Sequence, residues 1–471
     1  MDHPGNQPAI CGNEQAIEEA MNRATPVFLP ETNLRLEKIQ SCFAVALHMH
    51  QPLIPTGEGG ELISNLDNMF RTGDEYNAGV FADCYGRCGS LVPELAGAGH
   101  NPRVMLDYSG QLLYGLAKMG KKDVLDRMRP LACDPAMRRH AEWLGTMWGH
   151  AVAPSTPPPD YKLHMRAWQH EFAALYGLDA LARVRGFSPP EMHLPNHPDV
   201  SYEYIKALRD TGYRWLLVQE HTVEAAEGSN FNDRHIPYRL MAKNSQGEEV
   251  SIIALIKTQG SDTKLVAQMQ PYYEAKGQSP RTISGISIPP IVTQIGDGEN
   301  GGVMMNEFPP CFKQTMAQVG TGGTVAVNGT EYIELIEKTG LTGDKLPALR
   351  PAGQGFVLSR IKTWAPGAAE KAIAEIKKEN PNFAMDGGSW TNDRSWVSGY
   401  DNVLSPMNKL SADFHTAFGP SPDTRDGRYQ EALFLLLTSQ TSCFRYWGQG
   451  AWTDYAKTII ARGDALMRAR A

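Results

Sequence analysis

Two acidic stretches of this chain carry side chains that could act as a nucleophile or as an acid and base. Asp297 and Glu299 lie in a glycine-rich turn that directly follows a β-branched run at 291–295, and Glu191 follows two prolines at 189–190. Two carboxyl groups delivered from separate strand ends can cleave a glycosidic bond, one attacking as the ion while the other donates a proton. Taken alone, the turn at Asp297 is equally typical of an acidic surface loop.

Three histidines could join this chemistry. His48 and His50 end an apolar run at 42–49, where alternation of side chains along a strand puts both rings on the same side. His150 follows farther along the chain. The rings could lie in the core, donate hydrogen bonds to sugar hydroxyls or a carboxylate, or ligate Zn²⁺ together with an aspartate. A metal-dependent carbohydrate deacetylase therefore stays open, although HExxH and cysteine ligand patterns are absent and the carboxylate pair would have no role in it.

Strands and helices alternate along the first two thirds of the chain. We expect strands at 42–49, 102–107, 215–219, 251–257 and 288–295, with a strand-like run at 147–154. We expect helices at 76–98, 111–119, 137–146, 163–184, 201–211 and 263–276. This order predicts parallel strands with right-handed crossovers, in a barrel or a doubly wound sheet. Chemistry in such folds lies at the carboxyl ends of the strands, where the acidic turn is expected.

The two ends of the chain differ from this alternating region. Residues 1–38 are polar and mixed, with one short helix expected at 15–23. After about residue 330 the pattern is helical, and a glycine-rich loop carries Trp390 and Trp396. Tryptophans beside glycine and acidic residues are common at sugar-stacking sites, and they are also common in protein cores.

Composition narrows the class of partner. The chain has 471 residues, of which 42% are hydrophobic and 21% charged, so it can bury a sizeable core. A net charge of −7 and a pI near 6.0 argue against nucleic acid or an anionic membrane as partner, and favour a neutral polar substrate. Seven cysteines without a CxxC spacing predict reduced thiols in a cytoplasmic protein. The sequence shows neither a secretory signal nor an apolar run long enough to span a membrane.

The order of the motifs resembles glycoside hydrolase family 57, the group of α-amylases, amylopullulanases and 4-α-glucanotransferases. The resemblance covers roughly residues 40–450. It is carried by His48-Met49-His50-Gln51-Pro52, Gly149-His150 with Pro154, Gly186 to Met192, Ile295-Gly296-Asp297-Gly298-Glu299-Asn300, Gly388-Ser389-Trp390 and Ser442 to Gly448.

The resemblance implies a retaining glycoside hydrolase that acts on the α-1,4 linkages of α-glucans or maltooligosaccharides, and it leaves α-1,6 linkages open as a second target. It implies neither a cofactor nor a metal. Glu191 would be the nucleophile and Asp297 the acid/base. The residues expected to bind substrate are His48, His50, Gln51, Trp148, His150, Glu299, Trp390 and Trp396. The glycines beside Asp297 would let a sugar approach the backbone closely.

The same resemblance implies an incomplete (β/α)7 barrel at residues 39–335, behind an N-terminal extension at 1–38. An all-helical C-terminal domain at 336–471 would contribute to the substrate cleft. The chain departs from the family pattern at Phe187-Ser188, Gly301-Gly302 and Cys443. An α-glucan transglycosylase (a 4-α-glucanotransferase or branching enzyme) and a non-catalytic glucan-binding relative therefore stay open beside the hydrolase.

Overall fold

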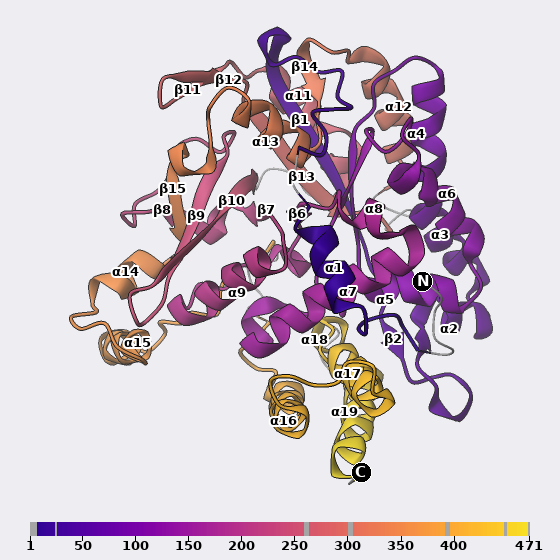
Figure 1. Ribbon diagram of the computed structural model, residues 1–471, viewed down its shortest axis with the longest axis vertical. Coiled ribbons are helices and arrows are strands. Elements are labelled where there is room, and N and C mark those ends of the chain that lie inside the picture. Colours follow the sequence, from indigo (N-terminus) through magenta and orange to yellow (C-terminus); the bar gives the residue numbers. More distant parts are fainter. Residues whose placement is uncertain are drawn as a thin grey trace.

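The computed structural model describes residues 7–23, 26–258, 263–299, 305–390, 396–446 and 450–469. Figure 1 shows a central group of strands surrounded by helices, with the last helices of the chain gathered below the strands beside the C-terminus. Seven strands run parallel to one another in this central group. They are β1 (Ile39–Met49), β4 (Val104–Tyr108), β5 (Ala141–Leu144), β6 (Gly186–Phe187), β7 (Trp215–Gln219), β10 (Glu249–Lys257) and β13 (Ile291–Asp297).

These seven strands form a ring in the order β5-β4-β1-β13-β10-β7-β6. Five of the junctions are parallel ladders of two to seven residue pairs, and the other two are shorter. β10 meets β13 through one residue pair, Lys257 with Thr293, and β5 meets β6 through one parallel bridge between Gly145 and Phe187. The bridge is secured by backbone hydrogen bonds from Gly145 to Gly186 and from Ser188 to Gly145, each 2.9 Å long. The fold is thus a (β/α)7 barrel, as expected, and its closure is incomplete at these two junctions.

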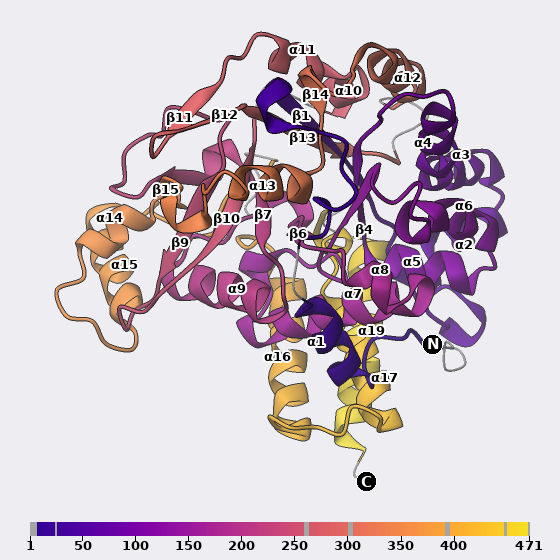
Figure 2. The ribbon, with the colours of Figure 1, turned by 45° about the horizontal axis from the view of Figure 1, so that its top comes forward.

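Helices follow the barrel strands and cover the outside of the ring (Figures 1 and 2). They are α2 (Asn65–Arg71), α3 (Glu75–Gly86), α4 (Cys88–Gly97), α5 (Gly110–Lys118), α6 (Lys122–Cys133), α7 (Tyr161–Tyr176), α8 (Leu178–Leu181), α9 (Pro198–Asp210), α10 (Thr263–Ala267), α11 (Gln270–Lys276), α12 (Phe308–Gln318) and α13 (Gly329–Glu337). The N-terminal helix α1 (Glu14–Met21) packs on α7 and α8.

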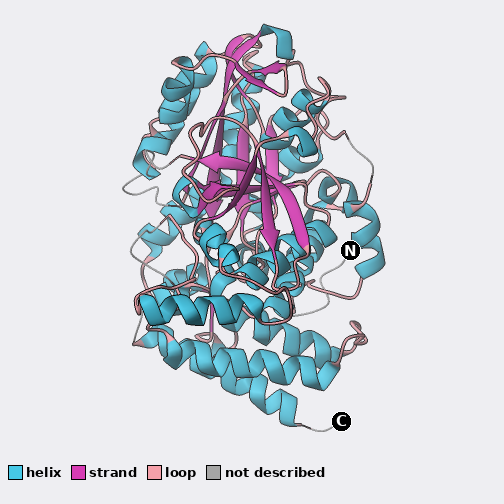
Figure 3. Cartoon of the chain, turned by 90° about the vertical axis from the view of Figure 1, so that its left-hand side faces the viewer, coloured by secondary structure: helices cyan, strands magenta, loops and turns pink. Residues whose placement is uncertain are grey.

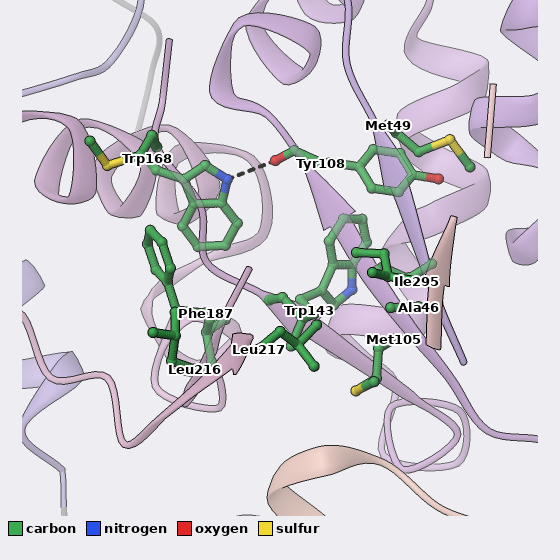
Figure 4. Close-up of a cluster of buried hydrophobic side chains, with 14 of the residues drawn as sticks. Ala46, Met49, Met105, Tyr108, Trp143, Trp168, Phe187, Leu216, Leu217 and Ile295 are labelled. Carbon is green, nitrogen blue, oxygen red and sulfur yellow. Dashed lines mark hydrogen bonds between the residues drawn. The ribbon is translucent and has the colours of Figure 1, made fainter. Parts of the chain in front are cut away.

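The core lies inside the ring and between the ring and its helices. All residues of β1 except Gln40 are buried, because β1 has barrel neighbours on both sides and helices outside. Figure 4 shows part of this core, in which Trp143 and Phe187 lie among aliphatic side chains of neighbouring strands. The indole of Trp168 donates a 2.8 Å hydrogen bond to the carbonyl of Tyr108, so this buried polar group is satisfied.

Further strands extend the sheet beyond the ring. β9 (Tyr238–Lys243) pairs antiparallel with β10, β15 (Ala348–Pro351) pairs with β9, and β8 (Val223–Ala225) pairs with β15. β14 (Gly323–Ala326) runs beside the start of β1. Two separate hairpins are formed by β2 (Leu53–Ile54) with β3 (Ile63–Ser64) and by β11 (Arg281–Ile283) with β12 (Ile286–Ile288). Because β15 belongs to this sheet, the sheet reaches past the domain boundary expected at residue 335.

The remainder of the chain is helical (Figure 3). Its helices are α14 (Gln354–Ser359), α15 (Ala368–Glu379), α16 (Asp401–Phe418), α17 (Gly427–Ser439), α18 (Cys443–Tyr446) and α19 (Ala451–Arg468). α16, α17 and α19 pack on one another, while α14 and α15 form a pair beside β15. In the part of the chain that the structure covers, none of these or the other helices is both long and apolar enough to cross a membrane.

Two expectations about local structure are wrong, and a third holds only in part. Residues 137–146, expected as a helix, contain β5, because the short run 141–144 is completely buried between β4 and β6 and tertiary burial overrides local propensity. Residues 147–154, expected as strand-like, form a turn with one isolated bridge residue, Ala151, and the start of a short 3₁₀ helix. The helix expected at 163–184 ends at Gly177, whose φ of 92° is left-handed, and resumes as α8.

Candidate active site

Three functional side chains stand in one row at the carboxyl ends of neighbouring strands. The parallel register pairs His48 of β1 with Asp297 of β13 on one side and with Asp107 of β4 on the other. The row follows from the sequence, because each apolar strand ends in a polar residue at the same level. It brings a histidine between two carboxyl groups at the end of the barrel where such folds carry their sites.

A cavity of about 370 Å³ opens above this row. It is lined by side chains from the barrel and from the C-terminal helical region: His48, His50, Gln51, Pro52, Asn65, Met69, Phe81, His150, Glu191, Asp297, Glu299, Trp390, Ser442, Cys443 and Trp452. The two acidic stretches singled out from the sequence therefore meet in one cavity. Its volume suits a small ligand, or one or two sugar rings of a longer one.

Glu191 is held from two directions. The Trp390 indole donates a 2.8 Å hydrogen bond to its Oε2, and the Ser442 hydroxyl lies 3.5 Å from its Oε1. The side chain is only 8% exposed. Its backbone has a φ of 59°, in the left-handed region that non-glycine residues rarely occupy. Backbone strain of this kind is concentrated at functional sites, and here it accompanies a carboxylate fixed in place by two donors.

A series of hydrogen bonds connects β4 to Glu191. His48 Nδ1 lies 2.9 Å from Oδ2 of Asp107, and its Nε2 lies 2.9 Å from Nε2 of His150. His150 Nδ1 in turn lies 2.7 Å from the hydroxyl of Ser442, which reaches Glu191. Buried polar groups linked in this way fix one another's direction. The orientation of Glu191 therefore depends on Asp107, to which it is linked through His48, His150 and Ser442.

Electrostatics determines the protonation of this series. Burial by itself lowers the pKa of His48, but the carboxylate of Asp107, with smaller contributions from Glu299 and Asp297, raises it to about 10. Burial lowers the pKa of His150, and the nearby imidazoles of His50 and His48 lower it further. A protonated His48 thus donates to Asp107 and to a neutral His150, which donates to Ser442, which donates to Glu191.

In the acidic turn, burial has a larger effect than the nearby charge of His48, and it favours the protonated forms of Asp297 and Glu299. Burial raises the pKa of Asp297, against the lowering effect of His48, and Asp107 raises it further. Burial and the charge of Asp297 raise the pKa of Glu299 to about 8. Two carboxyl groups this close do not both ionise readily at neutral pH, so the pair keeps a proton available.

Gly298, between these two acidic residues, packs against β1. A Cβ atom at this position would lie 2.2 Å from Cε of Met49, and the Gly298 amide donates a 2.8 Å hydrogen bond to the carbonyl of His48. The expectation that this glycine gives a sugar access to the backbone is therefore wrong, because the missing side chain makes room for a methionine. Asn300, Gly301 and Gly302 lie outside the described residues.

His50 and Gln51 occupy the wall of the cavity. Nδ1 of His50 lies 2.7 Å from the hydroxyl of Ser109, and its ring stacks on His150 with centroids 4.1 Å apart. Burial and the charge of His48 lower the pKa of His50, so its ring is neutral. Gln51 accepts a 3.1 Å hydrogen bond from the side chain of Asn65. The other ring nitrogen of His50 lies 3.4 Å from the hydroxyl of Thr441, so both nitrogens of this ring have polar contacts within the protein.

Two of the tryptophans expected to bind substrate are elsewhere. Trp148 is fully buried, packs edge-to-face on Phe434 and has Gly110 against its ring. Trp396 is also fully buried, and neither indole lines the cavity. Both side chains pack in the core, which is the other role that the sequence left open for these tryptophans. Trp390 does line the cavity, and so does Trp452, which sequence reasoning did not single out.

Asp107, Ser109 and Ser442 were also missed. Asp107 and Ser109 follow the run at 102–107 just as His48 and His50 end the run at 42–49, so polar residues at an expected strand end were the available signal. Ser442 lies nearly 300 residues from its partner His150, and only the fold brings the two together.

The histidines are not arranged as a metal centre. His48 and His150 direct their Nε2 atoms at one another, and the outer nitrogens contact Asp107 and Ser442. Across the described ranges, no group of three or more His, Cys, Asp or Glu side chains is arranged to hold a metal ion.

Known proteins resemble this chain in structure rather than in sequence. No protein-family profile matches it, and no curated protein matches it in sequence. Among solved structures, a 4-α-glucanotransferase from Thermococcus litoralis is similar over 91% of this chain, with a TM-score of 0.56 and 16% sequence identity. This chain spans 60% of the length of that enzyme. A GH57-type branching enzyme from Pyrococcus horikoshii is similar over 90% of this chain and 88% of its own length, with a TM-score of 0.53 and 11% identity.

An α-amylase from Thermotoga maritima is also similar, over 91% of this chain and 93% of its own length, with a TM-score of 0.52 and 10% identity. The chain has the fold of the GH57 enzymes. At these levels of identity the likeness concerns the fold, and the GH57 fold accounts for the seven parallel strands.

Proposed function

We propose that the protein is a retaining glycoside hydrolase that acts on α-glucans. The observation that carries the proposal is that Glu191 and Asp297, on separate strand ends, line one cavity together with indole and imidazole rings. The GH57 fold supports it, because the named solved structures of this fold are enzymes of α-glucan chemistry.

In this proposal Glu191 attacks the anomeric carbon as a carboxylate. Bonds from Trp390 and Ser442 hold its two oxygens in place, which reduces the reorganisation needed to reach the transition state. Asp297 donates a proton to the departing glycosidic oxygen as that bond breaks. In the second step Asp297 takes a proton from water, whose oxygen displaces Glu191. The raised pKa of Asp297 suits the first step, because an acid must still hold its proton near neutral pH.

The protonated His48 lies beside Asp297 in the strand register. Its charge stabilises the Asp297 carboxylate that forms once the proton has been transferred, and its direction is fixed by Asp107. Trp390 and Trp452 offer ring faces or edges along the cavity, on which the apolar faces of glucose units can pack.

The test is product formation from maltooligosaccharides, amylose and pullulan by the wild type, Glu191→Gln and Asp297→Asn. We expect each variant to lose at least about a thousandfold in kcat, because each removes a group that acts in the transition state. Glu370→Gln is the matched control, since Glu370 is an exposed carboxylate that pairs with His197 outside the cavity. ¹H NMR of the first product should show the anomeric configuration of the substrate. Inversion would refute the double displacement.

The same reaction can end in transfer rather than hydrolysis. A labelled short acceptor distinguishes the two, because a 4-α-glucanotransferase or branching enzyme extends or branches the acceptor while a hydrolase releases reducing sugar. If wild type and both variants are equally silent and glucan binding persists, the protein is a binding relative. A chelator test with metal analysis addresses the deacetylase alternative: activity that disappears together with a stoichiometric metal would refute the glycosidase mechanism.

A further inference from the structure

A second cavity, of about 360 Å³, lies at the opposite end of the barrel strands. Arg214 directly precedes β7, and Ser251 lies near the start of β10, so the cavity is at the amino-terminal ends of these strands. It is lined by Arg209, Tyr213, Arg214, Arg239, Ser251, Ile252, Ile253, Gly343 and Asp344, which we call the arginine crevice. None of these residues has a part in the proposed glycosidase reaction.

Three arginines reach the crevice from three different elements. Arg209 is in the last turn of α9, Arg214 is in the link to β7, and Arg239 is on β9. α9 packs on β9 and β10, which brings these elements together (Figure 1). Guanidinium groups that share one cavity repel one another, so an anion bound between them would be stabilised.

Arg239 has unused hydrogen-bonding capacity. It lies opposite Ile253 in the ladder between β9 and β10, on the face that lines the crevice. Its Nε is buried, and no group in the described ranges accepts a hydrogen bond from it. A buried donor without an acceptor is unfavourable, and an oxyanion in the crevice would satisfy it.

Nearby carboxylates neutralise only part of the positive charge of the three arginines. Arg214 is paired with Glu337 at 2.8 Å. Asp344 is exposed at the rim of the crevice. A hydrogen bond from the Thr342 hydroxyl lowers the pKa of Asp344, and the charge of Arg239 makes a smaller contribution in the same direction. Arg209 forms no ion pair within the part of the chain that the structure describes. With Glu337 and Asp344 counted, the three arginines leave the crevice with one net positive charge.

We propose that the arginine crevice binds the phosphate group of a phosphorylated small molecule. The planar fork of a guanidinium matches phosphate oxygens in pairs, and Ser251 adds a hydroxyl donor. The volume accommodates a compound of the size of a sugar phosphate. A polynucleotide does not fit the same observations, because it needs an extended basic surface and the protein is acidic overall.

The test is isothermal titration calorimetry on the full chain with inorganic phosphate and with glucose 6-phosphate. Glucose, and chloride at the same ionic strength, serve as uncharged and simple-anion controls. We expect the two phosphates to bind and chloride to give no saturable heat, and any heat from glucose, which can enter the glucan cavity, to be the same in the wild type and in Arg239→Gln. Arg239→Gln should weaken phosphate binding about tenfold, because it removes one charge-assisted pair. Arg209→Gln, on an exposed helix end where folding is not at risk, should weaken binding as well.

Lys243→Gln is the matched control. Lys243 is on the same strand as Arg239 and on the same alternating face, but it contacts Glu249 and Trp364 outside the crevice. Phosphate binding that is absent from the wild type would overturn the proposal, and so would a loss in Lys243→Gln equal to that in Arg239→Gln. Because Glu191→Gln leaves the crevice intact, we expect it to bind phosphate normally, so the result is independent of the proposed glycosidase activity.

Discussion

Replacing Asp107 by asparagine tests the electrostatics of the cavity floor. Asparagine keeps the size of the side chain and an oxygen that can accept from His48 Nδ1, but it removes the charge that holds the imidazolium. Asp107 is 1% exposed, so water cannot substitute for the lost charge. We therefore expect a neutral His48 in the variant at pH 7, because burial alone lowers its pKa.

The size of the effect follows from the pKa. An ordinary histidine has a pKa of 6.5, whereas His48 in the folded protein has a pKa of about 10. At about 1.36 kcal/mol for each tenfold change in acidity, the difference corresponds to roughly 5 kcal/mol of stability. Breaking a buried ion pair from one side typically costs about 3 to 5 kcal/mol, which agrees. Since the folded pKa is raised, this stability is fully present below about pH 6.5, declines as the pH rises, and is lost as the pH passes through about 10.

Urea unfolding of the wild type and Asp107→Asn at pH 6 and pH 9.5 measures this difference. We expect the free energy of unfolding of Asp107→Asn to be lower than that of the wild type by about 3 to 5 kcal/mol at pH 6, and by less than about 1 kcal/mol at pH 9.5. Asp123→Asn is the control: its carboxylate lies 3.9 Å from Arg127 on the surface of α6, and its loss should cost less than about 1 kcal/mol at both pH values. A difference for Asp107→Asn that is small at pH 6, or equal at both pH values, would refute a charged His48 held by Asp107.

Three further predictions concern the same carboxyl chemistry and the core. Ser442→Ala removes the link between His150 and Glu191, and we expect kcat on maltooligosaccharides to fall about tenfold while the melting temperature changes by a few degrees; an unchanged kcat would remove Ser442 from the site. Because burial raises the pKa of Asp297, the fall of kcat/KM with rising pH should set in at a higher pH than the 3.8 of an ordinary aspartate, and a fall centred at about that ordinary value would contradict its role as a buried acid. Burial raises the pKa of Glu142 from 4.5 to about 8, so its ionisation should reduce stability by up to about 1.4 kcal/mol per pH unit between those values; Glu142→Gln should remove this part of the decline, as urea titrations at pH 5 and pH 8 would show.

Much of the barrel could be predicted from the sequence. The runs at 42–49, 215–219 and 251–257 are largely apolar over five to eight residues, and each became a barrel strand because burial on both faces needs such residues. Strand β5 was not predicted, because four residues carry too little periodicity to identify a strand. β6 has two residues and is defined only by its neighbours on either side.

The site was predictable where chemistry and chain position coincide. Glu191, Asp297, His48 and His150 lie at or after strand ends, and all four line the cavity. The role of Trp148 was not predictable, because an indole in a core and an indole at a sugar site have the same local sequence. Its position is decided by Phe434, almost 300 residues away in the helical region.

The two short junctions of the ring divide the barrel into two plates. One plate is β13-β1-β4-β5 and carries Asp297; the other is β6-β7-β10 and leads to Glu191. Within each plate the strands are joined by ladders of two to seven residue pairs, whereas each seam between plates has a single residue pair or bridge. The two carboxyl groups therefore belong to parts of the barrel that few backbone hydrogen bonds join directly, and side-chain hydrogen bonds such as that from Ser442 to Glu191 add to the connection. Hydrogen exchange should be fastest along these seams, and a bound glucan that bridges the plates should slow it by acting as a clamp across both.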